Sequence, residues 1–149
     1  IYTLSLHDAL PICKVAVVFW SGTGNTEAMA KLVAEGAQEK GAEVSTCGPS
    51  DFSAAKAADY DAIAFGCPAM GAEELEDGEF EPMFSNCELS GKRIGLFGSY
   101  GWGDGEWLRS WEDDAKAAGI DLATDSVMVN GAPEDEGADL CKALGAALA

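Results

Sequence analysis

Short apolar runs alternate along this chain with stretches whose apolar residues recur at the three-to-four spacing of a helix. Residues 15–19 are almost continuously apolar, which is typical of a strand buried on both faces of a sheet. Residues 43–47 are only half apolar and predict an edge strand. The remaining predicted strands are 61–67, 92–98 and part of 122–129.

Helical stretches fill the gaps between these strands. Apolar residues recur at helical spacing within 27–40, and Gly41 follows as a residue suited to a helix C-terminus. Further helices are predicted at 106–118 and 134–148, with shorter helical turns within 49–56 and 69–87. The alternation predicts one doubly wound α/β domain, with a five-stranded parallel sheet in the order 2-1-3-4-5 and helices on both faces.

The loop between the first strand and the first helix has the composition of an anion site. It opens a helix, whose first-turn N–H groups and macrodipole favour a phosphate. Its hydroxyl side chains can donate hydrogen bonds, its glycines let the backbone approach closely, and it contains no Lys or Arg. The residues predicted to surround the phosphate are Ser21, Gly22, Thr23, Gly24, Asn25 and Thr26.

Two common phosphate loops do not fit this stretch. A Walker A loop requires Lys directly after its last glycine, where this chain has Asn25. The dinucleotide fingerprint requires a third glycine, and Glu27 stands at that position. The alternative that the loop leaves open is an ordinary strand-to-helix turn whose polar residues only cap the helix.

Charge and cysteine usage narrow the function classes. The 26 acidic and 9 basic residues give a net charge of −17, which argues against nucleic-acid binding and favours protein partners that carry a basic patch. No apolar run approaches the roughly 20 residues of a membrane-spanning helix, so we expect no membrane partner. Five cysteines without a C-x-x-C pair favour reduced thiols in the cytoplasm. A zinc site is not expected, because the only histidine, His7, precedes the predicted domain.

One cysteine has the sequence spacing of a catalytic phosphatase motif. Cys87 and Arg93 have the C-x5-R spacing of a phosphatase loop, in which a thiolate attacks phosphate. That chemistry needs the cysteine at the end of a strand, whereas Cys87 follows a predicted helix and Arg93 begins a predicted strand. We interpret the spacing as chance.

Residues 1–13 do not match the pattern of the rest. They lack the basic start and the cleavage site of a signal peptide, and they include no initiator Met. Our hypothesis is an artefactual extension from cloning or sequence assembly, with the domain at 14–149. A natural short extension is the alternative.

Three loops with unusual chemistry follow the first, third and fourth predicted strands. In the predicted sheet the strand order reverses there, and ligands of such sheets bind beyond the carboxyl ends of the strands at that point. The second loop carries Met70, and the third carries Tyr100 and Trp102. A flat ring could lie between the thioether and the indole, with its phosphate on the first loop. The alternative is that Met70 fills a gap in the core and Trp102 packs on the adjacent helix.

Four blocks of sequence together resemble the short-chain flavodoxins of anaerobic bacteria: residues 20–27, 69–71 with Glu73, 79–82, and 98–105. The resemblance covers essentially all of 14–149. It implies a flavodoxin-like fold, tightly but non-covalently bound FMN, and a low-potential one-electron carrier that acts as a monomer between redox enzymes. It implies no catalytic residue of the protein's own.

The resemblance also implies roles for single residues. Residues 21–26 would wrap the FMN phosphate, Met70 would pack on the inner face of the isoalloxazine ring, and Trp102 on the outer face. Glu73 would accept a hydrogen bond from flavin N3, and the carbonyl of Gly71 would turn toward N5 when the flavin is half-reduced. The residues expected around the ring and ribityl chain are Pro68, Ala69, Met70, Gly71, Ala72, Glu73, Ser99, Tyr100, Gly101, Trp102, Gly103 and Asp104. Two of them, Pro68 and Ala72, replace the Ser and Asp of close relatives.

Carboxylates near the flavin would lower its potential, because the fully reduced flavin is an anion. The candidates are Glu73, Glu76, Asp77 and Asp104. The same carboxylates would attract a basic partner.

Two other functions are weighed against an electron carrier. An FMN-dependent quinone or disulfide reductase on the same fold would need substrate room above the flavin and a proton donor. The predicted domain has no histidine, and Trp102 would cover the outer face. A receiver domain without FMN would need an acidic cluster after the first strand, where this chain has Trp20, Ser21 and Gly22.

Overall fold

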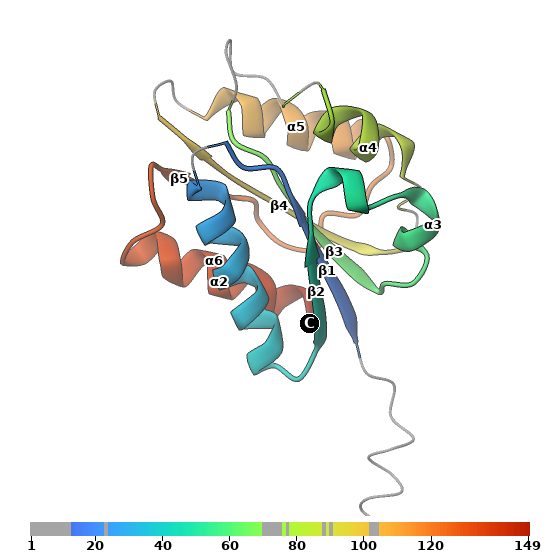
Figure 1. Ribbon diagram of the computed structural model, residues 1–149, viewed down its shortest axis with the longest axis horizontal. Helices are drawn as coiled ribbons and strands as arrows, with labels where there is room; N and C mark the ends of the chain where they lie inside the picture. Colours follow the sequence, from blue (N-terminus) through green and yellow to red (C-terminus); the bar gives the residue numbers. More distant parts are fainter. Residues whose placement is uncertain are drawn as a thin grey trace, which may run out of the picture.

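The computed structural model describes residues 13–22, 24–69, 76, 78–87, 89, 91–101 and 105–149. Its centre is a parallel sheet of five strands in the order β2-β1-β3-β4-β5, as the sequence predicts (Figure 1). The strands are β1 (Lys14–Phe19), β2 (Glu43–Cys47), β3 (Ala62–Gly66), β4 (Arg93–Tyr100) and β5 (Val127–Asn130).

Helices cover both faces of the sheet (Figure 1). One face packs against α2 (Asn25–Glu39) and α6 (Glu136–Leu148). The other carries the 3₁₀ turn η1 (Pro49–Asp51), α3 (Ala54–Ala57), α4 (Phe80–Asn86) and α5 (Glu106–Ala117). This three-layer arrangement confirms the predicted doubly wound fold.

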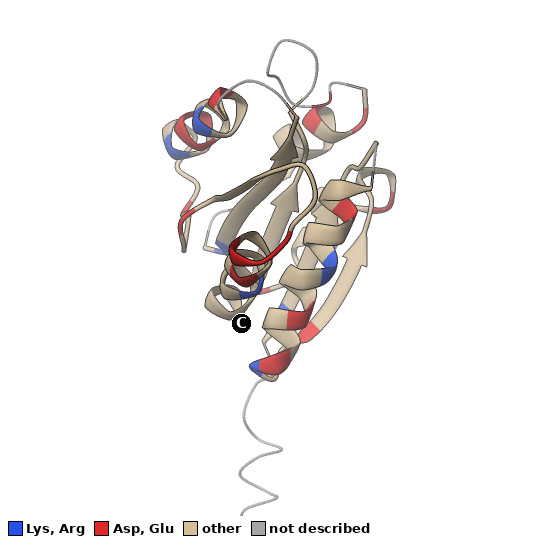
Figure 2. Cartoon of the chain, turned by 90° about the vertical axis from the view of Figure 1, so that its left-hand side faces the viewer, with Lys and Arg blue, Asp and Glu red and all other residues tan. Residues whose placement is uncertain are grey.

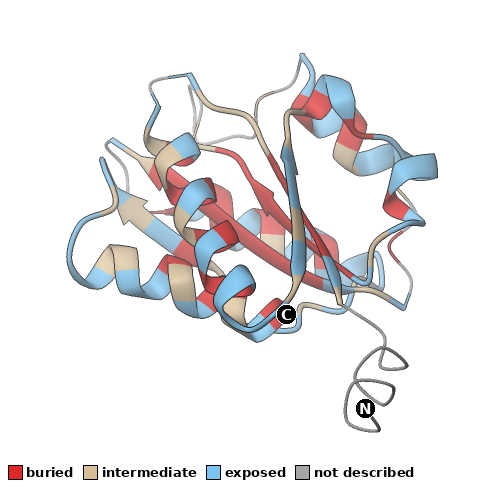
Figure 3. Ribbon diagram, turned by 60° about the horizontal axis from the view of Figure 1, so that its bottom comes forward, coloured by how far each residue is buried: buried red, intermediate tan, exposed pale blue. Residues whose placement is uncertain are grey.

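Strand β1 shows why the central strands are continuously apolar. Successive side chains of a strand point to opposite faces, and here both faces are covered. Val15 and Val17 belong to the core under α2 and α6, whereas Ala16 and Val18 belong to the core under the other helices. Figure 3 shows the central strands as buried between helices that are exposed on their outer sides.

The strand ends differ from the sequence prediction in two places. The last strand is shorter than the predicted run, because Leu122 makes only an isolated bridge to Ile94 before the polar residues 124–126 interrupt the ladder. Strand β4 extends two residues further than predicted, because Ser99 and Tyr100 pair with Val129 and Asn130 of β5. Only the second difference lengthens the sheet at its carboxyl edge.

The two chain ends of the domain meet at the amino edge of the sheet. The Cys13 carbonyl accepts a hydrogen bond from the N–H of Glu43 at 2.9 Å. The guanidinium of Arg93, at the start of β4, donates to the Cys13 sulfur at 3.0 Å and to the carbonyl of Leu148 at 2.9 Å. One arginine therefore ties the start of β1 to the end of α6.

Among the described residues, no helix combines the length and the apolar character needed to cross a membrane.

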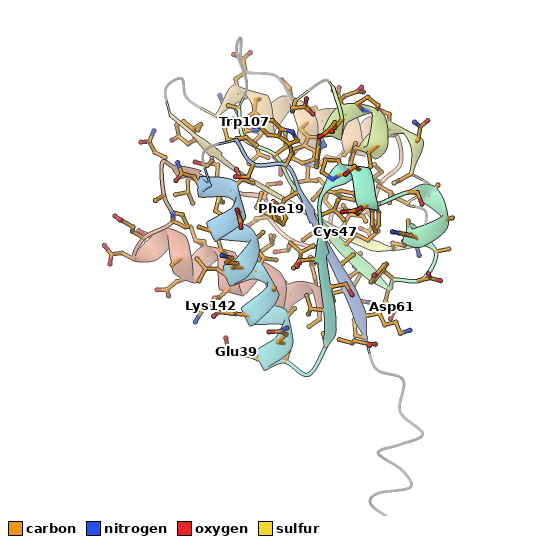
Figure 4. All side chains as sticks on the ribbon, in the orientation of Figure 1. Phe19, Glu39, Cys47, Asp61, Trp107 and Lys142 are labelled. Carbon is orange, nitrogen blue, oxygen red and sulfur yellow. The ribbon has the colours of Figure 1, made fainter. Side chains whose placement is uncertain are left out.

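The backbones of α2 and α6 pack directly against each other at two glycines, Gly36 and Gly145. A Cβ on Gly36 would lie 2.0 Å from the carbonyl oxygen of Lys142, and a Cβ on Gly145 would lie 1.9 Å from that of Val33. Both distances are far inside van der Waals contact, so the two backbones touch where no side chain can fit. Lys142 also lies 3.9 Å from the carboxylates of Glu35 and Glu39 (Figure 4). These two exposed ion pairs contribute little to stability compared with the close contact of the helices.

We predict that Gly36→Ala and Gly145→Ala each destabilise the protein by about 3 kcal/mol, which lowers Tm by roughly 9 °C. Helix propensity alone predicts the opposite sign, since Ala is favoured over Gly in a helix by about 1 kcal/mol. Thermal unfolding followed by circular dichroism measures the sign directly. Gly48→Ala is the control, because its Cβ would meet only the carbonyl oxygen of Phe19 at 3.8 Å. Unchanged or higher Tm values for both helix variants would contradict the close contact.

The carboxylate of Glu76 binds the backbone N–H groups at the start of α4. The side chain of Glu76 accepts hydrogen bonds from the backbone N–H groups of Gly78, Glu79 and Phe80, each at 2.8 Å. Partial burial alone would raise the pKa of Glu76, but these three hydrogen bonds outweigh it and hold the pKa below its ordinary range. A lowered pKa in the folded state stabilises the fold above the ordinary Glu pKa, and that stability is lost as pH falls through the folded-state value.

We therefore predict that Glu76→Gln lowers the free energy of unfolding by about 1 kcal/mol at pH 7, with a gap that closes below about pH 4. Urea unfolding at pH 7, 5 and 3.5 measures the gap. Glu79→Gln is the control, since the Glu79 side chain makes no capping hydrogen bond. A gap that stays constant with pH would mean that the charge of Glu76 does not contribute.

Candidate functional site

The loop after β1 is built around the hydroxyl of Ser21. Its Oγ accepts hydrogen bonds from the N–H groups of Gly24 at 3.1 Å and Glu27 at 3.3 Å. Gly24 has a φ of +97°, a conformation that favours glycine, and its carbonyl accepts the N–H of Ala28 at 3.0 Å. Because the Ser21 oxygen accepts twice, its own proton remains available for a further acceptor.

The first turn of α2 leaves donors without partners. The backbone N–H groups of Asn25 and Thr26 are the first two of the helix and have no acceptor among the described residues. Thr26 is only 1% exposed, and its Oγ1 has no hydrogen-bond partner in the described structure. A buried hydroxyl without a partner beside two free N–H groups indicates a site for an acceptor-rich ligand.

The loops after β3 and β4 are joined to each other. The N–H of Cys67 donates to the carbonyl of Phe97 at 3.1 Å, and the N–H of Ala69 donates to that of Ser99 at 3.0 Å. The indole Nε1 of Trp107, in α5, donates to the carbonyl of Cys67 at 3.1 Å (Figure 4). The β3 loop is thus fixed against β4 as far as Ala69.

The β4 end is fixed in turn by the segment after β5. The Ser99 hydroxyl donates to the carbonyl of Gly131 at 2.6 Å, and the N–H of Gly131 donates to the carbonyl of Tyr100 at 2.9 Å. The side-chain amide of Asn130 donates to the carbonyl of Gly101 at 3.3 Å. The Ser99 side chain is therefore already engaged, which limits its expected part in ligand binding.

A pocket of about 260 Å³ lies where the three loops meet. It brings together most of the described residues predicted for the site, from all three loops. Its lining residues are Trp20, Gly22, Asn25, Pro68, Ala69, Ser99, Tyr100 and Gly101. Trp20 was not among the predicted site residues, although its place directly after the first apolar run could have indicated it. Ser21, Gly24 and Thr26 lie in the adjoining loop and first helical turn.

Eight predicted site residues lie outside the described residues. They are Thr23, Met70, Gly71, Ala72, Glu73, Trp102, Gly103 and Asp104. The sequence assigns them to the same three loops, and their roles remain predictions.

The carboxyl edge of the sheet is acidic. Each of α2, α4, α5 and α6 begins at that edge, and the first turns carry Glu27, Glu81, Glu106, Glu136 and Asp139. Figure 2 shows red residues at these helix starts, beside the heads of the strand arrows. None of the nine Lys and Arg residues belongs to the loops that line the pocket. Glu76 is among the carboxylates predicted to lie near the ligand. In the structure its carboxylate instead accepts hydrogen bonds from the backbone N–H groups at the start of α4.

The cysteines do not form a chemical site. All five thiols are free, and burial raises the pKa of Cys67 to about 12 and that of Cys141 to about 11. The described residues include no group of His, Cys, Asp and Glu that could hold a metal ion. Cys87 follows α4 and Arg93 begins β4, as expected if their spacing is chance.

Comparison with known proteins agrees with this geometry. The flavodoxin family model matches residues 17–145. The chain is 46% identical over 140 residues to a flavodoxin from Megasphaera elsdenii, covering 91% of this chain and 98% of that protein. It is 43% identical over 121 residues to a flavodoxin from Clostridium beijerinckii, covering 80% of this chain and 88% of that one.

A solved structure gives the same result in three dimensions. The solution structure of two-electron reduced Megasphaera elsdenii flavodoxin superposes with a TM-score of 0.84 at 44% identity, over 90% of this chain and 97% of that one. The strand order, the meeting of three loops at the carboxyl edge and these matches agree. The chain belongs to the flavodoxin family of FMN-binding electron carriers.

Proposed function

We propose that the carboxyl edge of the sheet holds FMN with its phosphate on residues 21–26 and its ring between the loops 68–73 and 99–104. The observation that carries this placement is the buried Thr26 hydroxyl, which lacks a partner among the described residues. A phosphate oxygen supplies the acceptor that this hydroxyl and the free N–H groups of Asn25 and Thr26 require.

The phosphate site would work with neutral donors alone. The hydroxyls of Ser21 and Thr26 and the first-turn N–H groups of α2 donate, and no Lys or Arg of the chain belongs to the loop. Hydrogen bonds to a charged group are each stronger than neutral ones, so several of them together can hold the phosphate without a counterion. No basic side chain of the phosphate loop therefore offsets the acidic residues at the carboxyl edge of the sheet.

The ring contacts rest on the family resemblance. Met70 on the inner face, Trp102 on the outer face and Glu73 at N3 are proposed contacts of residues outside the described structure. Within it, Tyr100 packs beside Trp107 with ring centroids 5.6 Å apart, so its ring forms a fixed wall of the pocket.

FMN supplies one-electron chemistry, and the protein sets the energy of that step. The carboxylates at the first turns of α2, α4, α5 and α6 disfavour any further negative charge on a bound group. We infer a low reduction potential from this charge distribution.

The chain is an electron-transfer protein, and a reductase on the same fold is not favoured. The described residues include no histidine that could deliver a proton, and the raised thiol pKa values keep the buried cysteines protonated. Its partners are therefore redox proteins, and we propose that they present basic surfaces to the acidic edge. We also propose a reducing compartment, the cytoplasm, and a monomeric state.

We further propose that 14–149 is the FMN-binding domain and that residues 1–13 are an extension outside it. The family match, which begins at residue 17, supports this boundary. Cys13, the last residue of the proposed extension, contacts Glu43 and Arg93 and so adjoins the first strand.

We predict that Thr26→Val weakens FMN binding about 10- to 100-fold, because a hydrogen bond to a charged phosphate is lost. Riboflavin, which lacks the phosphate, should bind the variant and the parent equally well. The apoprotein should be as stable as the parent or more so, since Val leaves no buried hydroxyl without a partner. Flavin fluorescence titrations and urea unfolding of the apoprotein measure these effects. Thr46→Val, at an exposed position of β2, is the control.

Equal FMN affinities of parent and Thr26→Val would place the phosphate elsewhere. Equal losses for FMN and riboflavin would mean that Thr26 acts through the fold and not through the phosphate.

We predict that electron transfer to a basic c-type cytochrome slows steeply as ionic strength rises to about 0.1 M and beyond, where the Debye length falls below about 10 Å. At low salt the variant Glu106→Gln/Glu136→Gln should react several-fold more slowly than the parent. The control Glu43→Gln/Asp59→Asn removes the same charge near the amino edge and should react almost as fast as the parent. Stopped-flow rates against ionic strength test both statements. A salt-independent rate, or equal losses in the two variants, would rule out docking at the acidic edge.

A further inference from the structure

Trp107 lies behind two walls of the pocket at the carboxyl edge, although it does not line the pocket itself. Its side chain is 1% exposed and belongs to the core between α5 and the sheet (Figure 4). Its ring packs beside that of Tyr100, and its Nε1–H reaches the carbonyl of Cys67, the residue before Pro68. Tyr100 and Pro68 both line the pocket. One buried side chain therefore joins the loop after β3 to the end of β4.

The hydrogen bond from Trp107 holds the first residue of the loop after β3. The Cys67 carbonyl accepts the indole Nε1–H at 3.1 Å, and the N–H of the same residue donates to the carbonyl of Phe97 at 3.1 Å. The Cys67 thiol accepts the N–H of Glu76 at 3.4 Å. A buried carbonyl that loses a donor costs about 1–3 kcal/mol unless it moves to find another. The position of Cys67 therefore depends on the indole.

Gly98 of β4 allows this contact. A Cβ at that position would lie 2.2 Å from the carbonyl oxygen of Cys67 and 2.9 Å from Cζ2 of the Trp107 ring. Both distances are far inside van der Waals contact, so the indole and the carbonyl meet where β4 has no side chain. The ring, the carbonyl and the β4 backbone are close-packed, and close-packed groups transmit a displacement from one to the next.

Trp111, one turn further along α5, provides a comparison within the same helix. It is 3% exposed, and its ring packs against Phe80 and Phe84 of α4. Its Nε1–H has no acceptor among the described residues, and it does not line the pocket at the carboxyl edge. The two indoles are therefore alike in burial and differ in the hydrogen bond to a pocket loop.

The indole N–H of Trp107 also directs charge towards the pocket. The hydrogen end of the N–H dipole is positive and points at the carbonyl of Cys67, just beyond the end of β3. No Lys or Arg belongs to the loops that line the pocket, so oriented N–H groups offset negative charge there. A buried dipole acts strongly, because little water screens it. Loss of this N–H would make an added electron in the pocket less favourable.

We propose that Trp107 is a positioning residue for the flavin ring, because its Nε1–H holds the Cys67 carbonyl and thereby sets the separation of the two loops that face the ring. The inference rests on the proposed FMN site at the carboxyl edge. It gives a residue outside the pocket a part in both flavin affinity and reduction potential.

The test compares Trp107→Phe with Trp111→Phe. Both variants replace a buried indole of α5 by the same smaller ring, but only the first removes a hydrogen bond to a pocket loop. Serial dilution of the flavin-loaded proteins, followed by flavin fluorescence, gives dissociation constants for FMN and for riboflavin. We expect Trp107→Phe to bind both flavins about 5-fold more weakly than the parent, which corresponds to roughly one hydrogen bond. Trp111→Phe should keep both affinities of the parent.

The reduction potential separates a positioning role from a merely structural one. In Trp107→Phe the reduced flavin should lose about 3-fold more affinity than the oxidised flavin, because the positive end of the indole dipole is gone. For a one-electron step this lowers the midpoint potential by about 28 mV. Trp111→Phe should keep the potential of the parent. Spectroelectrochemical titration of the FMN-loaded proteins measures these potentials.

A third variant keeps the shape of the indole. Benzothienylalanine at position 107 has sulfur in place of the indole N–H, so its ring still packs beside Tyr100 and β4 but cannot donate a hydrogen bond. It should reproduce the affinities and the potential of Trp107→Phe. It also provides the test if the smaller ring prevents Trp107→Phe from folding.

Three results would overturn the inference. The first is parent-like affinities and potential in Trp107→Phe, which would mean that the Cys67 carbonyl needs no donor. The second is equal losses in Trp107→Phe and Trp111→Phe, which would assign the effect to the packing of α5. The third is parent-like behaviour of the benzothienylalanine variant, which would mean that the shape of the ring matters and its N–H does not.

The proposed FMN site is tested separately from this inference. Thr26→Val distinguishes FMN from riboflavin through the phosphate, whereas Trp107→Phe should weaken both flavins equally. A phosphate effect at Thr26 without any effect at Trp107 would overturn the positioning role alone. A parent protein that binds no flavin would overturn the proposed function and this inference together.

Discussion

The burial of β1 on both faces is the constraint on which the rest of the structure depends. Its two sets of side chains enter two separate cores, and its two edges pair with β2 and β3. Parallel pairing on both sides forces the chain to cross over by helices, and it places the ends of β1, β3 and β4 at one edge. The candidate site is a consequence of that topology, because its three loops lie together only when these strands are neighbours.

The sequence predicted most of this because the strongest patterns come from buried elements. The apolar run at 15–19, the helical spacing at 27–40 and the turn at Gly41, whose φ is +92°, all correspond to observed features. The prediction failed at strand ends. Residues 122–126 look like part of a strand by composition, but only tertiary contacts decide that pairing with β4 begins again at Val127. The carboxylate of Glu76 looked like part of an acidic surface, and only the structure shows it bound to the start of α4.

The candidate site was less predictable, since its character depends on hydrogen bonds that no sequence pattern records. The hydroxyls of Ser21, Thr26 and Ser99 look equivalent in the sequence. In the structure Ser21 organises the loop, Ser99 is bound to Gly131, and Thr26 is left without a partner among the described residues. Only the last condition indicates a missing ligand. The sequence is equally silent on Trp107 and Trp111, of which only Trp107 has an acceptor for its indole N–H among the described residues.

The arginine that joins the start of β1 to the end of α6 has a consequence for how this domain can be tethered. Cys13 and Leu148 share the guanidinium of Arg93 at the amino edge, and the three loops that we propose to hold FMN follow the opposite ends of the strands. A linker attached at either end would therefore leave the acidic edge, with its proposed FMN site, free to meet another redox centre. Such a tether would replace diffusional encounter with a high effective concentration, and its length alone would set how often the two centres meet.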